Sequence, residues 1–467
     1  MQVAESAVET VKERLKDSKL KNEIILIKKD KDMKSKKNAV VILLSICLLS
    51  CSQDKVLELP LTMQNGYGPF RMGLGGMSPN SENVDNPWYK TYLKVSKFPE
   101  GLTDIQLGHI ESNIYQSVYQ NYLVGNITKD WYEELQKSWN WTPDTLNLSK
   151  TPIKTKIAFV YGKDSEGVTR MVVDANNNLD LNDDELFIPL DMASIDDNAN
   201  KDSIAQVQAV NVSFETFVHN KIVPVSVPLL VMYHSQISMF MSNFSQYAIT
   251  KYKGEQIAVS SGFTNLSYEN IQIAFLRDDL KNGEKVTEED IYRKNEYIEI
   301  KDEIFKIIGV NTNKSTLVLE KTDLPKAQLL STQIGYKSYP FQGEEFTEKT
   351  PVSSDNLKGK YVLLDFWATW CGPCIQEFPH LKELYSKTDR AKFEIVGIVG
   401  DSQPNTLTDA VERYELTWPQ IFSDKITETY GVNSYPTTFL IDTEGVIVAK
   451  NLRGKELEEK ILSLIEE

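Results

Sequence analysis

Residues 361–374 read YVLLDFWATWCGPC, an apolar run that ends in a C-x-x-C pair. The run predicts a buried strand, and the two cysteines lie where a helix would begin. A helix N-terminus favours negative charge because its first N–H groups are unpaired, so it favours the thiolate, which is the reactive form of cysteine. We therefore expect Cys371 to attack a disulfide and Cys374, one turn further in, to resolve the mixed disulfide.

This stretch resembles the active-site segment of thioredoxins, and residues 331–467 resemble a thioredoxin-fold domain of the envelope-anchored TlpA/ResA type. Two matches lie outside the motif: Pro379 stands where thioredoxins kink their active-site helix, and Tyr435-Pro436-Thr437 resembles the loop that faces the dithiol. The resemblance implies that Pro436 is cis. It also implies that Asp365 is buried behind the second cysteine, with a raised pKa that suits it to accept the proton of Cys374.

The resemblance further implies which residues touch a substrate chain: Trp370, Gly372, Pro373, Tyr435 and Pro436. A C-x-x-C pair is also half of a zinc site, but such a site needs four ligands and His380 is the only histidine in this tail. We therefore favour redox chemistry over metal binding, and we expect the reaction to require no cofactor.

The rest of the tail fits an α/β domain with a mixed sheet between helices. Residues 393–399, 437–441 and 446–449 read as strands, the last two joined by a hairpin turn, and 455–466 reads as an amphipathic helix. We predict a multidomain protein in which this thioredoxin-like domain follows a largely β domain with some helix.

The opposite end of the chain carries a targeting pattern. Residues 33–37 are basic, 39–49 are apolar, and Leu48-Leu49-Ser50-Cys51 resembles the lipobox of bacterial lipoproteins. The apolar run is too short to span a bilayer, although a short anchor or a buried core segment is an alternative. We expect 33–50 to be a lipoprotein signal peptide, Cys51 to carry lipid, and 1–32 to be a mis-annotated or disordered extension.

This pattern predicts a lipid-anchored protein of the bacterial cell envelope that faces the periplasm or is associated with the outer membrane. Of the four cysteines, Cys47 would leave with the signal peptide and Cys51 would be lipidated, so only the dithiol remains to form a disulfide. The 467 residues suffice for two or three domains, and the net charge of −15 argues against nucleic acid as a partner.

The middle of the chain shows no enzyme signature. We expect 51–84 to be a flexible tether, because it is rich in Gly, Pro, Asn, Ser and Met, and 85–330 to be the largely β domain of unknown role. Residues 129–139 read as a helix capped by Thr128. His109, His219 and His234 lie in unrelated segments, so we expect them to be ordinary core or surface residues.

An acidic loop at 174–185 spaces oxygen ligands as a calcium loop does. The candidate Ca²⁺ ligands are Asp174, Asn176, Asn178, Asp180, Asn182 and Glu185. Leu179 stands where the EF-hand has glycine, and a strand-like segment precedes the loop in place of a helix. The alternative is a solvated acidic turn, which we slightly favour.

These features predict an envelope thiol–disulfide oxidoreductase. We lean towards a reductant because the Gly-Pro pair between the cysteines is that of reducing thioredoxins. Its partners would be envelope protein disulfides or thiols and a membrane-bound electron donor. Two alternatives remain: a thiol peroxidase-like enzyme, and a lipoprotein whose β domain captures an envelope ligand.

Overall fold

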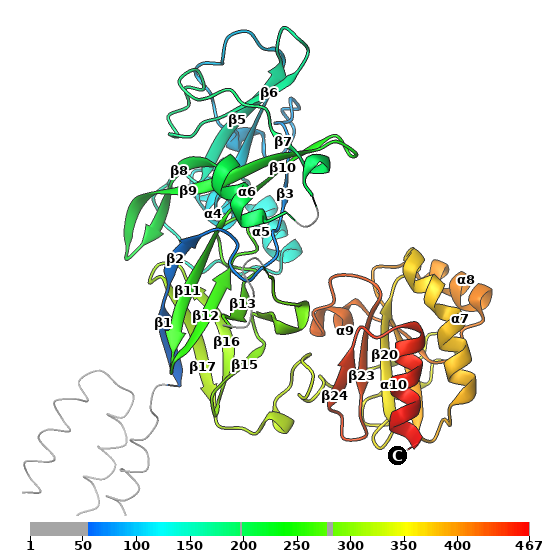
Figure 1. Ribbon diagram of the computed structural model, residues 1–467. Coiled ribbons are helices and arrows are strands. Elements are labelled where there is room, and N and C mark those ends of the chain that lie inside the picture. Colours follow the sequence, from blue (N-terminus) through cyan, green and yellow to red (C-terminus); the bar gives the residue numbers. More distant parts are fainter. Residues whose placement is uncertain (1–54, 197–198, 278–283, 467) are drawn as a thin grey trace, which may run out of the picture. The chain divides into compact units, whose positions relative to one another are not determined.

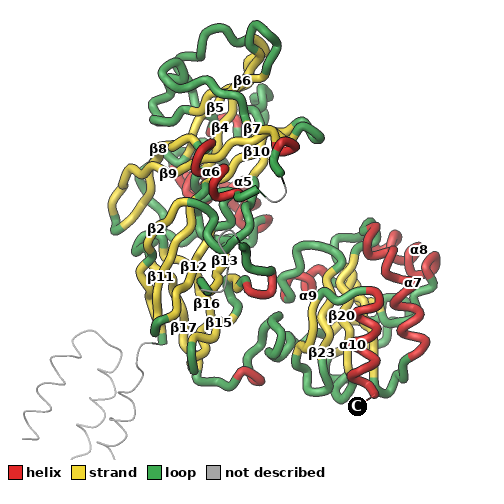
Figure 2. Tube along the Cα trace, in the orientation of Figure 1, coloured by secondary structure: helices red, strands yellow, loops and turns green. Residues whose placement is uncertain are grey.

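The computed structural model describes residues 55–196, 199–277 and 284–466. Strands dominate as far as residue 330, and long helices are concentrated after residue 370 (Figures 1 and 2). No helix within the described ranges is long and apolar enough to cross a membrane. The predicted signal peptide, the lipidation site Cys51 and the extension 1–32 lie outside the described residues.

Four sheets build the region before residue 330. The first has the order β1 (Val56–Pro60), β17 (Thr316–Thr322), β16 (Glu303–Asn311), β15 (Tyr297–Ile300). The second has the order β14 (Tyr292–Arg293), β13 (Gln272–Phe275), β12 (Glu255–Ser260), β11 (Gln246–Tyr252), β2 (Thr62–Asn65). The third has the order β3 (Gly75–Met77), β10 (Met239–Phe244), β9 (Lys221–His234), β7 (Leu190–Asp191), with β8 (Val210–Val218) also paired to β9. The fourth is β4 (Thr103–Glu111), β5 (Lys156–Lys163) and β6 (Thr169–Val173).

Among the described residues before position 330, the α-helices that accompany these sheets are α4 (Ile114–Leu123), α5 (Lys129–Ser138) and α6 (Lys201–Gln208). The helix predicted at 129–139 is α5, and the Thr128 hydroxyl caps it by accepting the N–H of Trp131. The capping residue satisfies one of the free N–H groups of the first turn. Tyr132 and Leu135 are the residues that α5 buries.

The expected tether at 51–84 is corrected by the structure. Residues 56–60 form β1, which pairs antiparallel with β17, and Tyr67 and Phe70 are completely buried. Composition misled here because turn-forming residues surround short strands that are held by partners far along the chain. Residues 297–311 form the hairpin of β15 and β16, and Lys301, with φ 55°, lies in the turn that joins these two antiparallel strands.

The C-terminal domain has a five-stranded mixed sheet. Its order is β22 (Gln420–Phe422), β21 (Phe393–Val399), β20 (Tyr361–Trp367), β23 (Thr437–Ile441), β24 (Ile447–Lys450). A small two-stranded sheet, β18 (Gln342–Glu344) with β19 (Pro351–Ser353), precedes it. The helices are α7 (Gly372–Lys387), α8 (Pro404–Tyr414), α9 (Asp424–Thr429) and α10 (Gly454–Glu466).

The sheet is covered on both faces, which explains why β20 reads as an almost continuous apolar run. Side chains alternate along the strand. Leu363 and Trp367 enter a core shared with α7, α8 and α10, whereas Leu364 and Phe366 enter a second core that includes Ile426 of α9. Asp365 therefore lies on the face of the sheet that α7 covers.

Candidate active site

The dithiol is at the N-terminus of α7. Cys371 is the N-cap residue, and its sulfur accepts the N–H of Cys374 at 3.2 Å. The two sulfurs are joined in a disulfide whose Cα atoms are 5.3 Å apart. Gly372 and Pro373 occupy the exposed first turn, where a proline costs no hydrogen bond. The helix thus places the first sulfur among free N–H groups, which favour a thiolate there.

Burial does not distinguish the two cysteines in the disulfide form. Cys371 is 3% exposed and Cys374 is 2% exposed. Both residues belong to the same buried cluster as Trp367 and Phe378, so the bridge is covered on its inner side by the domain core. The distinction between the two sulfurs in this form comes from their position on the helix and not from exposure.

Asp365 is 4% exposed and lies in the middle of β20. Burial, reinforced by the negative charge of Glu377 and opposed by Arg453, raises the pKa of Asp365 to about 7. A carboxyl with this pKa can accept and return a proton near neutral pH, which is the behaviour that a general base needs.

Glu377 and Arg453 are site residues that we did not predict from the sequence. Glu377 is one turn along α7 from Cys374, and its carboxylate accepts the N–H of Gly454 at 2.9 Å. The guanidinium of Arg453 donates to the carbonyl of Pro436 at 2.7 Å. The i, i+3 spacing of Cys374 and Glu377 was a usable signal, since such residues share a helix face, whereas nothing local marks Arg453.

The Tyr435–Pro436 peptide bond is cis, as the resemblance implied. Pro436 is buried and Tyr435 half-buried, while the indole of Trp370 is 63% exposed and packs edge-on against the Tyr435 ring at 6.0 Å. Trp370 also donates its indole N–H to the carbonyl of Asp401 at 2.7 Å. An exposed, fixed aromatic side chain beside the dithiol forms a rim against which a substrate chain can pack.

Comparison with known proteins agrees with this geometry. The AhpC/TSA family matches residues 334–450. The thiol-disulfide oxidoreductase ResA of Bacillus cereus is 36% identical over 131 residues, which are 28% of this chain and 75% of the relative. The chain belongs to the TlpA/ResA-type thioredoxin-fold proteins. Its activity is therefore thiol–disulfide oxidoreduction.

Other relatives match a similar share of the chain. ResA of Geobacillus thermodenitrificans is 36% identical over 160 residues, which are 30% of this chain and 89% of the relative. The thioredoxin-like protein YneN of Bacillus subtilis is 36% identical over 131 residues, which are 26% of this chain and 76% of the relative. Among solved structures, the thioredoxin domain of a thiol-disulfide oxidoreductase from Bacteroides vulgatus is 29% identical, covers 31% of this chain and 99% of that one, and has a TM-score of 0.27.

The acidic loop at 174–185 does not assemble the predicted Ca²⁺ ligands. Both carboxylate oxygens of buried Asp174 accept backbone N–H groups of the loop, at 3.0 and 2.9 Å, and Asp180 pairs with Lys97. Asn182 and Glu185 are exposed. Across the described ranges, no three His, Cys, Asp or Glu side chains gather as a metal site. Leu179 turns the chain with φ 65° although it is not glycine.

The other two asparagines of the loop also have partners within it. The amides of Asn176 and Asn178 donate to Asp183 at 3.3 and 2.9 Å. Asp174, Asn176, Asn178 and Asp180 are thus all engaged in hydrogen bonds or an ion pair in this structure.

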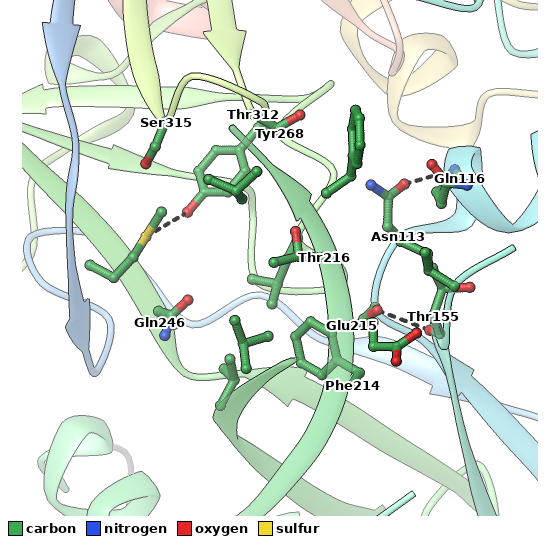
Figure 3. Close-up of a pocket in the computed structure, with 18 of the residues that line it drawn as sticks. Asn113, Gln116, Thr155, Phe214, Glu215, Thr216, Gln246, Tyr268, Thr312 and Ser315 are labelled. Atoms are coloured by element: carbon green, nitrogen blue, oxygen red, sulfur yellow. Dashed lines mark hydrogen bonds between the residues drawn. The ribbon is translucent and has the colours of Figure 1, made fainter. Parts of the chain in front are cut away.

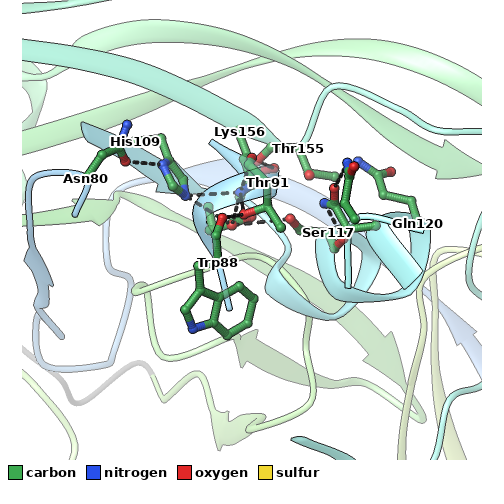
Figure 4. Close-up of polar contacts among 12 residues, drawn as sticks. Asn80, Trp88, Thr91, His109, Ser117, Gln120, Thr155 and Lys156 are labelled. Atoms are coloured by element: carbon green, nitrogen blue, oxygen red, sulfur yellow. Dashed lines mark hydrogen bonds and ion pairs between the residues drawn. The ribbon is translucent and has the colours of Figure 1, made fainter. Parts of the chain in front are cut away.

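One histidine of the β region belongs to a buried polar cluster that the sequence did not reveal (Figure 4). The Lys156 ammonium lies 3.1 Å from Nε2 of His109 and 3.2 Å from a carboxylate oxygen of Glu111. It also donates to the carbonyl of Thr91 at 2.9 Å. The facing positions of β4 and β5 bring Glu111 opposite Lys156, a pairing between residues 45 positions apart that no local pattern indicates.

Proposed function

We propose that the protein is a reductant of envelope disulfides that works through a mixed disulfide on Cys371. The observation that supports this best is the dithiol at the start of α7, on the face of the sheet that also carries a buried carboxyl with a pKa of about 7. A thiolate nucleophile and a proton acceptor of matched pKa are what two-step disulfide exchange requires.

In the reduced protein, the Cys371 thiolate attacks one sulfur of the substrate disulfide, and the other sulfur leaves and takes up a proton. Asp365 then removes the proton of Cys374, whose thiolate attacks the Cys371 sulfur. The substrate departs with two thiols and the protein keeps the Cys371–Cys374 disulfide. The electron pair lost by the protein is the pair gained by the substrate.

The Tyr435–Pro436 loop and Trp370 would hold the substrate during this exchange. Pro436 is kept in place by the hydrogen bond from Arg453, and Tyr435 packs against Trp370. Gly372 and Pro373 are exposed at the start of α7, between the two cysteines, where an extended chain can contact them. These contacts orient the substrate sulfur towards Cys371.

The direction of electron flow is inferred from the Gly-Pro pair between the cysteines. This pair is that of reducing thioredoxins, whose potential is roughly −270 mV, whereas strong oxidants are near −120 mV. A membrane-bound donor would restore the dithiol after each turnover. The lipobox-like residues that end in Cys51 support a lipid anchor in the bacterial envelope, facing the periplasm or associated with the outer membrane.

Trapping tests the mechanism. Cys374→Ser should accumulate substrates as mixed disulfides that dithiothreitol releases, while Cys371→Ser and the double variant should accumulate essentially none. Equal trapping by the two single variants would contradict the assigned roles. Alkylation of thiols in intact cells tests the direction: a dithiol found mostly oxidised at steady state, with the donor present, would contradict a reductant.

Two further measurements test anchoring and the peroxidase alternative. Mass spectrometry of the mature N-terminus should find a lipidated Cys51, and an unmodified chain would remove the anchor. The AhpC/TSA match makes peroxide reduction worth excluding. The Thr369 hydroxyl is 2.9 Å from that of Thr406, so it is already engaged away from the dithiol, and we expect no turnover of hydrogen peroxide above that of free dithiol.

A further inference from the structure

A cavity of about 400 Å³ lies in the β region, far along the sequence from the dithiol (Figure 3). Its walls come from β2, the start of α4, β8, β9 and the turn between β16 and β17. This volume is in the range of pockets that enclose small molecules. Because several sheets and a helix contribute to it, the cavity is shaped by the tertiary fold and not by one flexible loop.

The chemistry of the lining restricts what could fill the cavity. Phe214, Val225, Val227 and Leu266 provide apolar walls. No lysine, arginine or histidine is among its described lining residues, and the one carboxylate is that of Glu215, which accepts the N–H of Lys154 at 2.8 Å. An anionic ligand would therefore lose its hydration without gaining a counter-charge, whereas an uncharged apolar molecule would not.

Tyr268 supplies one polar group of the lining that lacks a good partner, and the buried hydroxyl of Thr155, which has no hydrogen-bond partner among the described residues, is another. The residue is 7% exposed, and its hydroxyl donates to the sulfur of Met63 at 3.6 Å (Figure 3). A thioether is a weak acceptor, so a carbonyl or ether oxygen would serve this donor better. Burial raises the pKa of Tyr268, so the hydroxyl keeps its proton at neutral pH and remains a donor.

We propose that this cavity binds a small uncharged molecule with an apolar body of one or two rings and an oxygen acceptor that meets the Tyr268 hydroxyl. Phe214 and the valines of β9 contact the body, and Tyr268 fixes its orientation. Because none of the described lining residues is cationic, we expect carboxylates and sulfonates to bind more weakly than uncharged molecules. The inference concerns the β region alone and does not rest on the redox function.

Fluorescence titration of the full chain tests this with two probes. Prodan is a neutral naphthalene with a carbonyl acceptor, and 8-anilinonaphthalene-1-sulfonate has a similar size but is anionic. We expect one-to-one saturation by Prodan with a Kd below about 100 μM, and at least tenfold weaker binding of the sulfonate. Tyr268→Phe should weaken Prodan binding roughly three- to tenfold, which is the effect of losing one hydrogen bond.

A pair of tryptophan substitutions shows whether the probe occupies this cavity. Thr216 lines the cavity and lies on the face of β8 that carries Phe214, so Thr216→Trp should fill the space and abolish Prodan binding. Ile222 pairs with Phe217 in the same hairpin, is 41% exposed and does not line the cavity, so Ile222→Trp should bind like the wild type.

Circular dichroism and disulfide-reductase activity should be unchanged in all three variants, since none of these residues is near the dithiol in the sequence or part of the redox site. The proposal is overturned if Prodan fails to saturate, if Thr216→Trp binds it normally, or if the sulfonate binds as tightly. Should Thr216→Trp not fold, Tyr268→Phe still decides, because unchanged Prodan affinity in that variant would remove the assigned hydrogen bond.

Discussion

Asp365 in the C-terminal domain is buried and the side chain of Glu111 in the β region is 17% exposed, yet the pKa values of these two acidic residues move in opposite directions. Burial and the nearby charge of Glu377 raise the pKa of Asp365 to about 7. Burial would raise the pKa of Glu111 as well, but the hydrogen bond with His109 and the charge of Lys156 outweigh it and lower that pKa. The difference is the cation: Lys156 contacts Glu111 at 3.2 Å, while Arg453 donates to a carbonyl instead.

This contrast distinguishes Asp365, a carboxyl that can exchange a proton during a reaction, from Glu111, a carboxylate that stabilises the fold. A carboxyl without a bound cation keeps its proton to neutral pH and can exchange it there. A carboxylate in a buried ion pair stays charged and exchanges nothing, but its removal leaves an uncompensated partner. Burial alone therefore does not indicate function, and the partners of the buried group have to be known.

The largest effect should come from breaking the ion pair in the β region. Lys156→Met leaves Glu111 buried without its cation and should lower the free energy of unfolding by about 3–5 kcal/mol in chemical denaturation. Lys154→Met, two positions away and exposed, is the matched control and should change little. If Glu111→Leu does not recover most of the loss in the Lys156→Met background, the pair is not what stabilises this region.

The second prediction concerns a substitution, Asp365→Asn, that should raise the free energy of unfolding instead of lowering it. The folded protein keeps the Asp365 proton up to a pKa of about 7, whereas an unfolded carboxyl loses it near 3.8, so the folded state binds more protons between these values and loses stability as pH rises through this window. Asp365→Asn removes this penalty. In the oxidised protein, the free energy of unfolding of Asp365→Asn minus that of the wild type should grow by about 2–3 kcal/mol from pH 5 to pH 8.

A flat pH dependence of that difference would contradict the raised pKa of Asp365. Glu377→Gln is an intermediate control, because it removes the negative charge that helps to raise this pKa. It should narrow, but not abolish, the pH range over which the wild type loses stability.

The third prediction concerns Gly400, which leaves room for Tyr435 beside the dithiol. A β-carbon at this position would lie 2.4 Å from the Tyr435 hydroxyl oxygen, so Gly400→Ala must displace the ring. We expect kcat/KM for a protein disulfide to fall roughly tenfold with the fold retained. Tyr435→Phe removes the nearest colliding oxygen, but the β-carbon would still lie 2.8 Å from the Thr427 hydroxyl oxygen, so the double variant should recover only part of the loss. Failure to recover would mean that Gly400 acts through another contact.

The smallest effect should come from charges that are paired but not buried. Lys387 contacts Glu383 and Glu458 at 2.7 Å with its own side chain 45% exposed. Water and salt screen such contacts, so Lys387→Ala should leave the unfolding midpoint unchanged within error. A loss comparable with that of Lys156→Met would show that the number of ion contacts matters more than their burial.

The sequence was sufficient for the C-terminal domain because its signals are local. The apolar run of β20 and the C-x-x-C pair at a helix start are each contained in a few residues that predict their own backbone conformation, and the resemblance to thioredoxins implied the cis bond before Pro436. In the β region the same reasoning found α5 and several strands but missed β1, since Val56–Pro60 is a strand only through its pairing with Thr316–Thr322.

What the tertiary structure decided is the surroundings of the polar side chains. Only the fold places Glu377 and Arg453 about Asp365, covers the Cys371 sulfur, and sets Lys156 against Glu111 and His109. The identity of a side chain fixes which proton it can exchange. Its pKa and its partners depend on burial and on charges supplied by distant parts of the chain, because electrostatic interactions act through space and not along the sequence.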